Sequence, residues 1–115
     1  MLWMLMLAGA LTAQGAGRYV EVRYTADEVA LPYGVTYTAW LPEKAARLRG
    51  VLIHQHGCGV GAARGGQTAA YDLHWQALAA KWNLALLGPA FHVEKEEQGC
   101  GWSQPTGGSA KALLR

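Results

Sequence analysis

The sequence predicts an α/β fold in which an antiparallel pair of strands leads into a parallel strand–helix–strand unit. Three observations predict it. Two strand-like segments, 19–24 and 35–41, stand on either side of a turn. An apolar run over 50–55 ends in a glycine-rich loop. A segment with helical spacing, 69–81, then precedes a second apolar run at 84–87, the order expected of a parallel crossover.

The first two strands are predicted from different patterns. Residues 19–24 alternate between apolar and polar side chains, which is typical of a half-exposed strand. Residues 35–41 are rich in β-branched and aromatic side chains and end before Pro42. The segment 31–34 between them has the composition of a turn. An antiparallel pair follows from this order.

The next elements form the crossover. Residues 50–55 are largely apolar at successive positions, as in a strand covered on both faces. Asn83 would end the helix, and Gly88-Pro89 would end the short strand 84–87. One helical face is predicted from side chains at spacings of four, three and four residues: Tyr71, Trp75, Leu78 and Trp82.

The last part of the chain is a long loop followed by an opening helix. Residues 92–108 are rich in Glu, Gly and Cys. Ser109 has the character of a helix N-cap, and residues 110–115 begin a helix. A sheet with so few strands, ending in a helix that has just begun, leads us to expect that residues 16–115 are a truncated domain.

Composition excludes several classes of function. The chain has 115 residues, enough for one small domain, with 51% hydrophobic and 16% charged residues, as in globular proteins. Its net charge of +2 is too small to favour nucleic acid or an anionic membrane surface. We therefore expect no nucleic-acid partner.

The N-terminal segment resembles a secretory signal. The first 17 residues carry no charged side chain, and the apolar run Leu2–Leu11 is too short for a membrane span, which needs about 20 residues. Ala13-Gln14-Gly15 fits a small-x-small cleavage site. We expect residues 1–15 to be a signal peptide and the protein to be secreted or periplasmic. The alternatives are a hydrophobic N-terminal helix or a start codon assigned too early.

The residues that could carry chemistry follow the strand 50–55. His56-Gly57-Cys58-Gly59 turns the chain into a glycine-rich loop. Such a loop can aim backbone N–H groups at a developing negative charge, because glycine permits close approach and positive φ angles. The alternative is a purely structural glycine turn.

His-Gly-Cys-Gly between a strand and a helix resembles the α/β-hydrolase superfamily, and more narrowly the secreted polyhydroxybutyrate-depolymerase and feruloyl-esterase type. In those enzymes the third strand typically ends in His-Gly-Cys-Gly, and a Cys-Trp pair follows later. Cys58 matches the first cysteine, and Cys100-Gly101-Trp102 matches the pair with one extra residue. The segment 37–42 resembles the corner that ends their second strand. His54-Gln55 departs from the pattern, since aliphatic residues are usual there.

The resemblance implies roles for particular residues. The backbone N–H groups of Gly57 and Cys58 would form part of an oxyanion hole, and His56 would orient the loop by hydrogen bonding. Gly59 and Trp102 would belong to the loop and substrate surface. The substrate would be a small-molecule or polymeric ester, with no cofactor and no metal.

The nucleophile of such an enzyme is a serine in a G-x-S-x-G turn between a strand and a helix. Ser103 has Pro105 in place of the second glycine and no strand before it, and Ser109 is followed by Lys111 where the glycine would stand. We therefore expect a fragment of a secreted serine ester hydrolase that lacks the nucleophile and general base and is inactive alone.

The two cysteines allow two interpretations. Cys58 could be a thiol nucleophile near two histidines, or it could form a disulfide with Cys100, as an exported protein allows. The loops after neighbouring parallel strands emerge at the same edge of a sheet, so the two residues are expected to lie close together.

Two further functions stay open. His54 and His56 share one face of the strand and could share a metal, with His74 and His92 as possible further ligands, in a metal-dependent hydrolase. The chain could also be a non-catalytic binding or structural α/β module.

Overall fold

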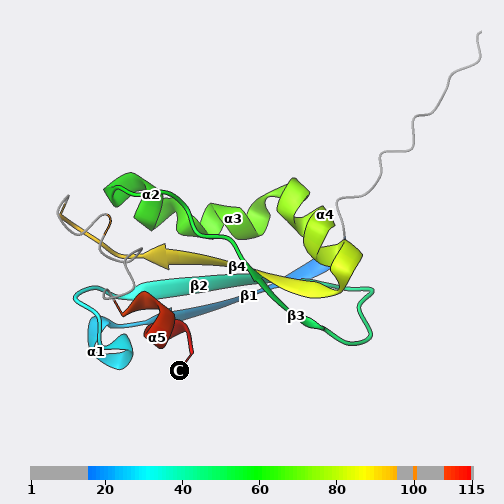
Figure 1. The fold of residues 1–115 in the computed structure, drawn as a ribbon, viewed down its shortest axis with the longest axis horizontal. Coiled ribbons are helices and arrows are strands. Elements are labelled where there is room, and N and C mark those ends of the chain that lie inside the picture. The colour runs from blue at the N-terminus through cyan, green and yellow to red at the C-terminus, as the bar shows by residue number, and fades with distance from the viewer. Residues whose placement is uncertain (1–15, 96–99, 101–107, 115) are drawn as a thin grey trace, which may run out of the picture.

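The structure, a computed structural model, describes residues 16–95, 100 and 108–114. It has a mixed α/β fold built on a four-stranded sheet of order β1-β2-β4-β3 (Figure 1). β1 (Gly17–Tyr24) pairs antiparallel with β2 (Val35–Pro42), and β2 pairs antiparallel with β4 (Leu84–Phe91). β3 (Gly50–Ile53) pairs parallel with β4. The predicted antiparallel pair and parallel pair are both confirmed.

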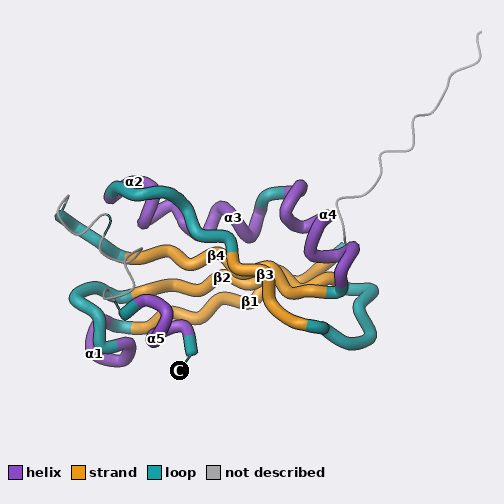
Figure 2. The backbone as a smooth tube through the Cα atoms, in the orientation of Figure 1, coloured by secondary structure: helices purple, strands orange, loops and turns teal. Residues whose placement is uncertain are grey.

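Short helices lie on both faces of the sheet (Figures 1 and 2). The connection from β3 to β4 runs over one face as α2 (Val60–Arg64), the 3₁₀ helix η1 (Gly65–Gln67), α3 (Thr68–Tyr71) and α4 (Leu73–Trp82). α1 (Ala26–Val29) and α5 (Ser109–Leu113) lie at the opposite face. None of the helices in the described ranges is long and apolar enough to cross a membrane.

The single helix predicted over 69–81 is wrong, because the chain breaks at Asp72. This residue has an extended backbone, with φ −74° and ψ 120°, and it separates α3 from α4. Its carboxylate accepts hydrogen bonds from the backbone N–H groups of His74, at 2.9 Å, and Trp75, at 3.3 Å. Asp72 is therefore an N-cap that starts a new helix.

The predicted apolar face of this helix is also wrong. Tyr71 and Trp82 are each 51% exposed and Leu78 is 38% exposed, whereas α4 buries Gln76 and Ala79. Ala79 packs with Trp40 and Leu86 in a core cluster, where a small side chain lets the helix lie close to the sheet.

β4 continues through Gly88 and Pro89 to Phe91, although this dipeptide was expected to end it. β3 ends at Ile53, opposite Leu87, and not at residue 55 as predicted. It is also not covered on both faces as predicted, since it is an edge strand in which Val51 is 56% exposed. Beyond Leu87, β4 is paired with β2 alone, so its other side has no ladder that would need the missing N–H of Pro89.

The presence of α1 and the start of α5 also differ from the prediction. α1 was not predicted, yet Thr25 and Glu28 form a reciprocal capping box with a Thr25 N–H to Glu28 carboxylate distance of 2.7 Å. Hydrogen bonds from Thr25 lower the pKa of Glu28, the one from its backbone most strongly. The N-cap of α5 is Gly108, with φ 79°, and Ser109 is the first helical residue, contrary to expectation.

The core consists of two clusters. Trp40, Ala79 and Leu86 pack under α4. The larger cluster lies toward the end of β4 and contains Val29, Leu31, Tyr33, Val35, Ala63, Phe91, Val93 and Ala112. Between them, the face of the sheet away from α4 is less covered.

This open face carries an apolar row that runs across all four strands. Cross-strand pairing joins Val20 to Ala39, Ala39 to Leu87, and Leu87 to Ile53. Val20 is 40% exposed and Ile53 is 39% exposed. Exposed apolar surface of this kind normally marks a contact site or an aggregation liability.

Candidate functional site

The site is the loop 54–59, which leaves the carboxyl end of β3. The last backbone tie to the sheet is the His54 N–H, which donates to the carbonyl of Leu87 at 3.0 Å. α2 begins at Val60, after Gly59 has taken φ 115° and ψ 153°. That positive φ strongly favours glycine at this position. Gly57 and Gly61, by contrast, do not have the positive φ that the sequence suggested for the glycines of this loop.

Backbone N–H groups lie in an exposed part of the loop, since Gly57 and Cys58 are both exposed. The N–H groups of Gly57, Cys58 and Gly59 donate no hydrogen bond to any residue that the structure describes. A Cβ atom placed on Gly57 or Gly59 would meet nothing within 4 Å. Three successive unpaired donors at the carboxyl end of a parallel strand can stabilise an anionic oxygen.

His56 ties this loop to α3. Its Nε2 lies 3.0 Å from Thr68 Oγ1. The Thr68 hydroxyl donates its own proton to the carbonyl of Gly65 at 2.8 Å, so it accepts from His56, and the His56 proton resides on Nε2. This is the bond that a loop-orienting histidine would make.

His54 packs against the helix layer. Its ring stacks on Trp75, with centroids 4.5 Å apart and an interplanar angle of 27°. Its Nδ1 is buried without a hydrogen-bond partner in the described part of the chain. The centroids of the His54 and His56 rings are 5.4 Å apart.

The histidines do not assemble into a metal centre. Among the residues that the structure describes, no three His, Cys, Asp or Glu side chains are grouped as metal ligands. His74 instead lies beside Asp72 at the surface, and His92 Nε2 lies 2.8 Å from Thr36 Oγ1. The four histidines named as possible ligands therefore do not form such a group within the described part of the chain.

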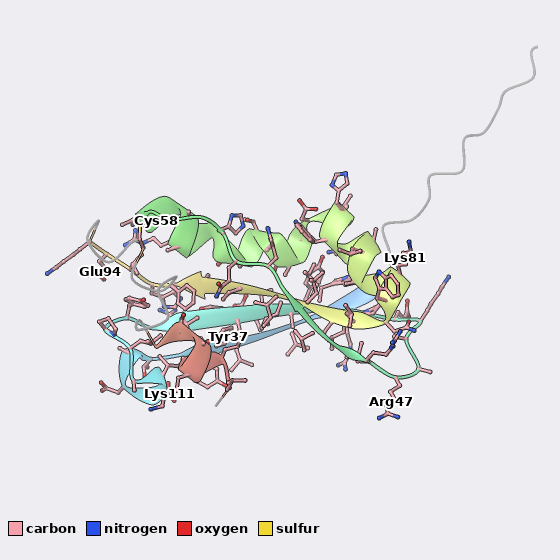
Figure 3. The ribbon with its side chains drawn as sticks, viewed as in Figure 1. Tyr37, Arg47, Cys58, Lys81, Glu94 and Lys111 are labelled. Atoms are coloured by element: carbon pink, nitrogen blue, oxygen red, sulfur yellow. A yellow bond between two sulfur atoms is a disulfide. The ribbon has the colours of Figure 1, made fainter. Side chains whose placement is uncertain are left out.

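A disulfide joins the loop to the segment after β4. Cys58 and Cys100 are bonded, with their Cα atoms 4.6 Å apart and a sequence separation of 42 residues. This confirms the expected proximity, and it leaves Cys58 without the thiol that a nucleophile needs. Cys58 lies at the same end of the molecule as Glu94, which follows β4 (Figure 3).

The remaining candidates are not brought to the loop. Trp102 and Ser103 lie outside the described residues. Ser109 is buried in α5, on the face of the sheet opposite α2, so it is not positioned beside the loop. Among the residues that the structure describes, no serine lies beside the 54–59 loop.

Arg64, in the helix that follows the loop, was missed by the sequence analysis, and His92 was considered there only as a metal ligand. Arg64 Nε donates to the carbonyl of Val93 at 2.7 Å and ties α2 to the chain after β4. Burial lowers the pKa of His92, and the charges of Arg23 and Arg64 lower it further. No sequence pattern links Arg23, Arg64 and the pair His92-Val93, which come from three separate segments.

Comparison of the chain with known proteins gives no further assignment: no family model, no curated protein and no solved structure matches it significantly.

Proposed function

We propose that this chain is the oxyanion-hole part of a serine ester hydrolase of the α/β-hydrolase type. The observation that carries the proposal is the run of unpaired N–H groups at Gly57, Cys58 and Gly59, where β3 ends beside the parallel strand β4. Ligands of open α/β sheets bind at the carboxyl ends of parallel strands.

The chemistry follows from where charge develops. When an ester carbonyl is attacked, its oxygen becomes an oxyanion, and fixed N–H donors stabilise that state more than the ground state. Two contacts hold the loop: the Cys58–Cys100 disulfide and the His56–Thr68 hydrogen bond. Donors held in place in advance need little reorganisation during the reaction.

The proposal assigns no nucleophile to this sequence, because neither of its two serines has the strand–turn–helix setting of an elbow. The 115 residues alone are therefore expected not to hydrolyse esters. The substrate would be a small or polymeric ester, with no cofactor. The disulfide fits the oxidising compartment of a secreted or periplasmic protein.

The first test is to read the coding DNA beyond Arg115 and to express the whole reading frame. We expect a G-x-S-x-G sequence after a predicted strand, and hydrolysis of p-nitrophenyl esters that is abolished by replacing its serine. A reading frame without this element, or a protein with no esterase activity, would contradict the proposal and favour a non-catalytic α/β module.

The second test asks whether the loop donates its N–H groups. Gly57→Pro removes one N–H, and Gly57→Ala keeps it while adding a Cβ that meets nothing within 4 Å. In the active protein we expect Gly57→Pro to lower kcat by about 10²–10³-fold and Gly57→Ala to have little effect. Equal activity of the two variants, with both folded by circular dichroism, would remove Gly57 from the oxyanion hole.

A further inference from the structure

An open hollow of ≈ 520 Å³ lies between the start of β1 and the junction of α3 with α4. Its walls include Tyr19, Trp40, Tyr71 and Gln76, and none of its lining side chains carries a charge. The hollow uses no residue of the 54–59 loop. A neutral wall of this kind disfavours phosphate-bearing or strongly charged ligands, which need a charged partner.

Two tyrosines form an aromatic surface at this hollow. The rings of Tyr19 and Tyr71 are stacked, with centroids 4.7 Å apart and an interplanar angle of 24°. Tyr19 is 45% exposed and Tyr71 is 51% exposed, so the pair presents aromatic area to solvent. Stacked rings that already support each other bind a flat apolar surface with little loss of side-chain freedom.

Gln76 adds a directed polar group beneath these rings. It is only 3% exposed, and its Nε2 donates to Tyr19 Oη at 2.7 Å and to the carbonyl of Ala70 at 2.8 Å. Both amide protons are therefore used. Oε1 has no hydrogen-bond partner among the residues described, and Gln76 lines the hollow. Because Tyr19 accepts from Gln76, its own O–H proton can point to a ligand.

We propose that this hollow binds a neutral sugar ring. A hydroxyl of the sugar donates to Gln76 Oε1, and a second accepts from Tyr19 Oη, since sugar hydroxyls can do both. The flat C–H face of the ring packs on the exposed aromatic surface of Tyr71. A simple phenol offers the flat face but only one hydroxyl, so it matches fewer of these groups.

The test is titration of the full ¹⁵N-labelled chain with cellotetraose, followed by NMR at the Gln76 side-chain amide. We expect saturable shifts of that amide at millimolar sugar. Tyr71→Ala should weaken binding about fivefold through loss of the stacking surface. Tyr19→Phe keeps the ring and should weaken binding about fivefold through loss of the hydroxyl. Trp82→Ala is the matched control, because Trp82 is also 51% exposed on α4 but does not line the hollow.

Three results would overturn the proposal. These are the absence of Gln76 shifts at millimolar cellotetraose, an equal effect of Trp82→Ala and Tyr71→Ala, and tighter binding of 4-ethylphenol than of cellotetraose in the hollow. Tyr71 is half exposed, so its variant keeps the test valid even if Tyr19→Phe lowers stability. None of these readouts depends on ester hydrolysis, so failure here and failure of the proposed function are separate outcomes.

Discussion

Gly65 and Gly66 are neighbours in the sequence with very different surroundings. A Cβ atom on Gly65 would meet nothing within 4 Å. A Cβ on Gly66 would collide with the carbonyl oxygen of Pro89, and it would lie 3.1 Å from Ala90 Cα. A Cβ on Gly88, on the strand below, would lie 2.8 Å from the carbonyl oxygen of Gly66, which is also closer than real Cβ contacts. The helix layer therefore meets β4 backbone to backbone at this point.

We predict that Gly66→Ala lowers the free energy of unfolding by about 1–3 kcal/mol, because added volume in a packed contact forces the backbone apart. Gly65→Ala is the control and should change it by less than about 0.5 kcal/mol. Urea unfolding of the two variants measures both values. A similar loss of unfolding free energy in both variants would show that the close approach of Gly66 to β4 is not its cause.

A second residue-scale prediction concerns His92. Its pKa in the folded chain lies below the ordinary value of 6.5, mainly through burial and then through Arg23 and Arg64. The unfolded chain therefore binds more protons between the two pKa values, and stability falls as pH decreases through 6.5 toward the folded-state value. Above the ordinary pKa this contribution is fully present.

His92→Gln should reduce this acid-dependent loss of stability. His74→Gln is the control, because the His74 side chain is 99% exposed. Urea unfolding at several pH values between neutral and mildly acidic conditions gives the slope for each variant. If His92→Gln keeps the slope of the unmodified protein, His92 is not the group responsible.

At the scale of elements, one carboxylate separates two helices of the layer that covers the sheet. Asp72 ends α3 and starts α4, whose Ala79 packs against Trp40 and Leu86. Its pKa is lowered, most strongly by the hydrogen bond from the Trp75 backbone, so it stays ionised in its capping role at neutral pH. A carboxylate at this position also interacts favourably with the positive end of the helix dipole.

Asp72→Ala should loosen the first turn of α4 and speed amide hydrogen exchange at His74 and Trp75, because their N–H groups lose their acceptor. Asp72→Asn keeps an acceptor oxygen and should exchange nearly as slowly as the unmodified protein. Unchanged exchange in Asp72→Ala would mean that tertiary packing alone holds this turn.

At the scale of the whole molecule, the disulfide joins the two loops that follow β3 and β4. It fastens Cys58, in the donor loop, to Cys100, in a segment outside the sheet. The sheet is covered unevenly, because the apolar row from Val20 to Ile53 lies on the face away from α4. The disulfide adds to the stability that the two core clusters give this sheet. A small domain with such partial burial gains much from one cross-link.

We predict that the double variant Cys58→Ser, Cys100→Ser loses about 2–4 kcal/mol of unfolding free energy, the range typical of a cross-link that closes a long loop. Urea unfolding measures the loss, and counting thiols in the unreduced protein provides the control. Two free thiols in the oxidised protein, or a variant as stable as the original, would contradict this prediction.

Elements whose sequence patterns are local could be predicted before the fold was known. Alternation in β1, β-branched residues in β2 and the apolar run of β3 predicted those strands, and His56-Gly57-Cys58-Gly59 marked the loop after β3. Periodicity and glycine spacing are properties of a few consecutive residues, so they can be recognised without knowing which elements pack against the segment. The capping box of Thr25 and Glu28 was equally local, and it could have revealed α1.

The extent of β4 and the buried face of α4 depend on neighbouring elements, so they could be known only from the fold. Pro89 fits within β4 because β3 ends opposite Leu87, and no pattern around Pro89 shows where another strand stops. Gln76 is buried while Trp82 is exposed, because the face of α4 that meets the sheet is set by the break at Asp72 and the close packing of Ala79. Burial is a property of two surfaces in contact, and a sequence pattern describes only one of them.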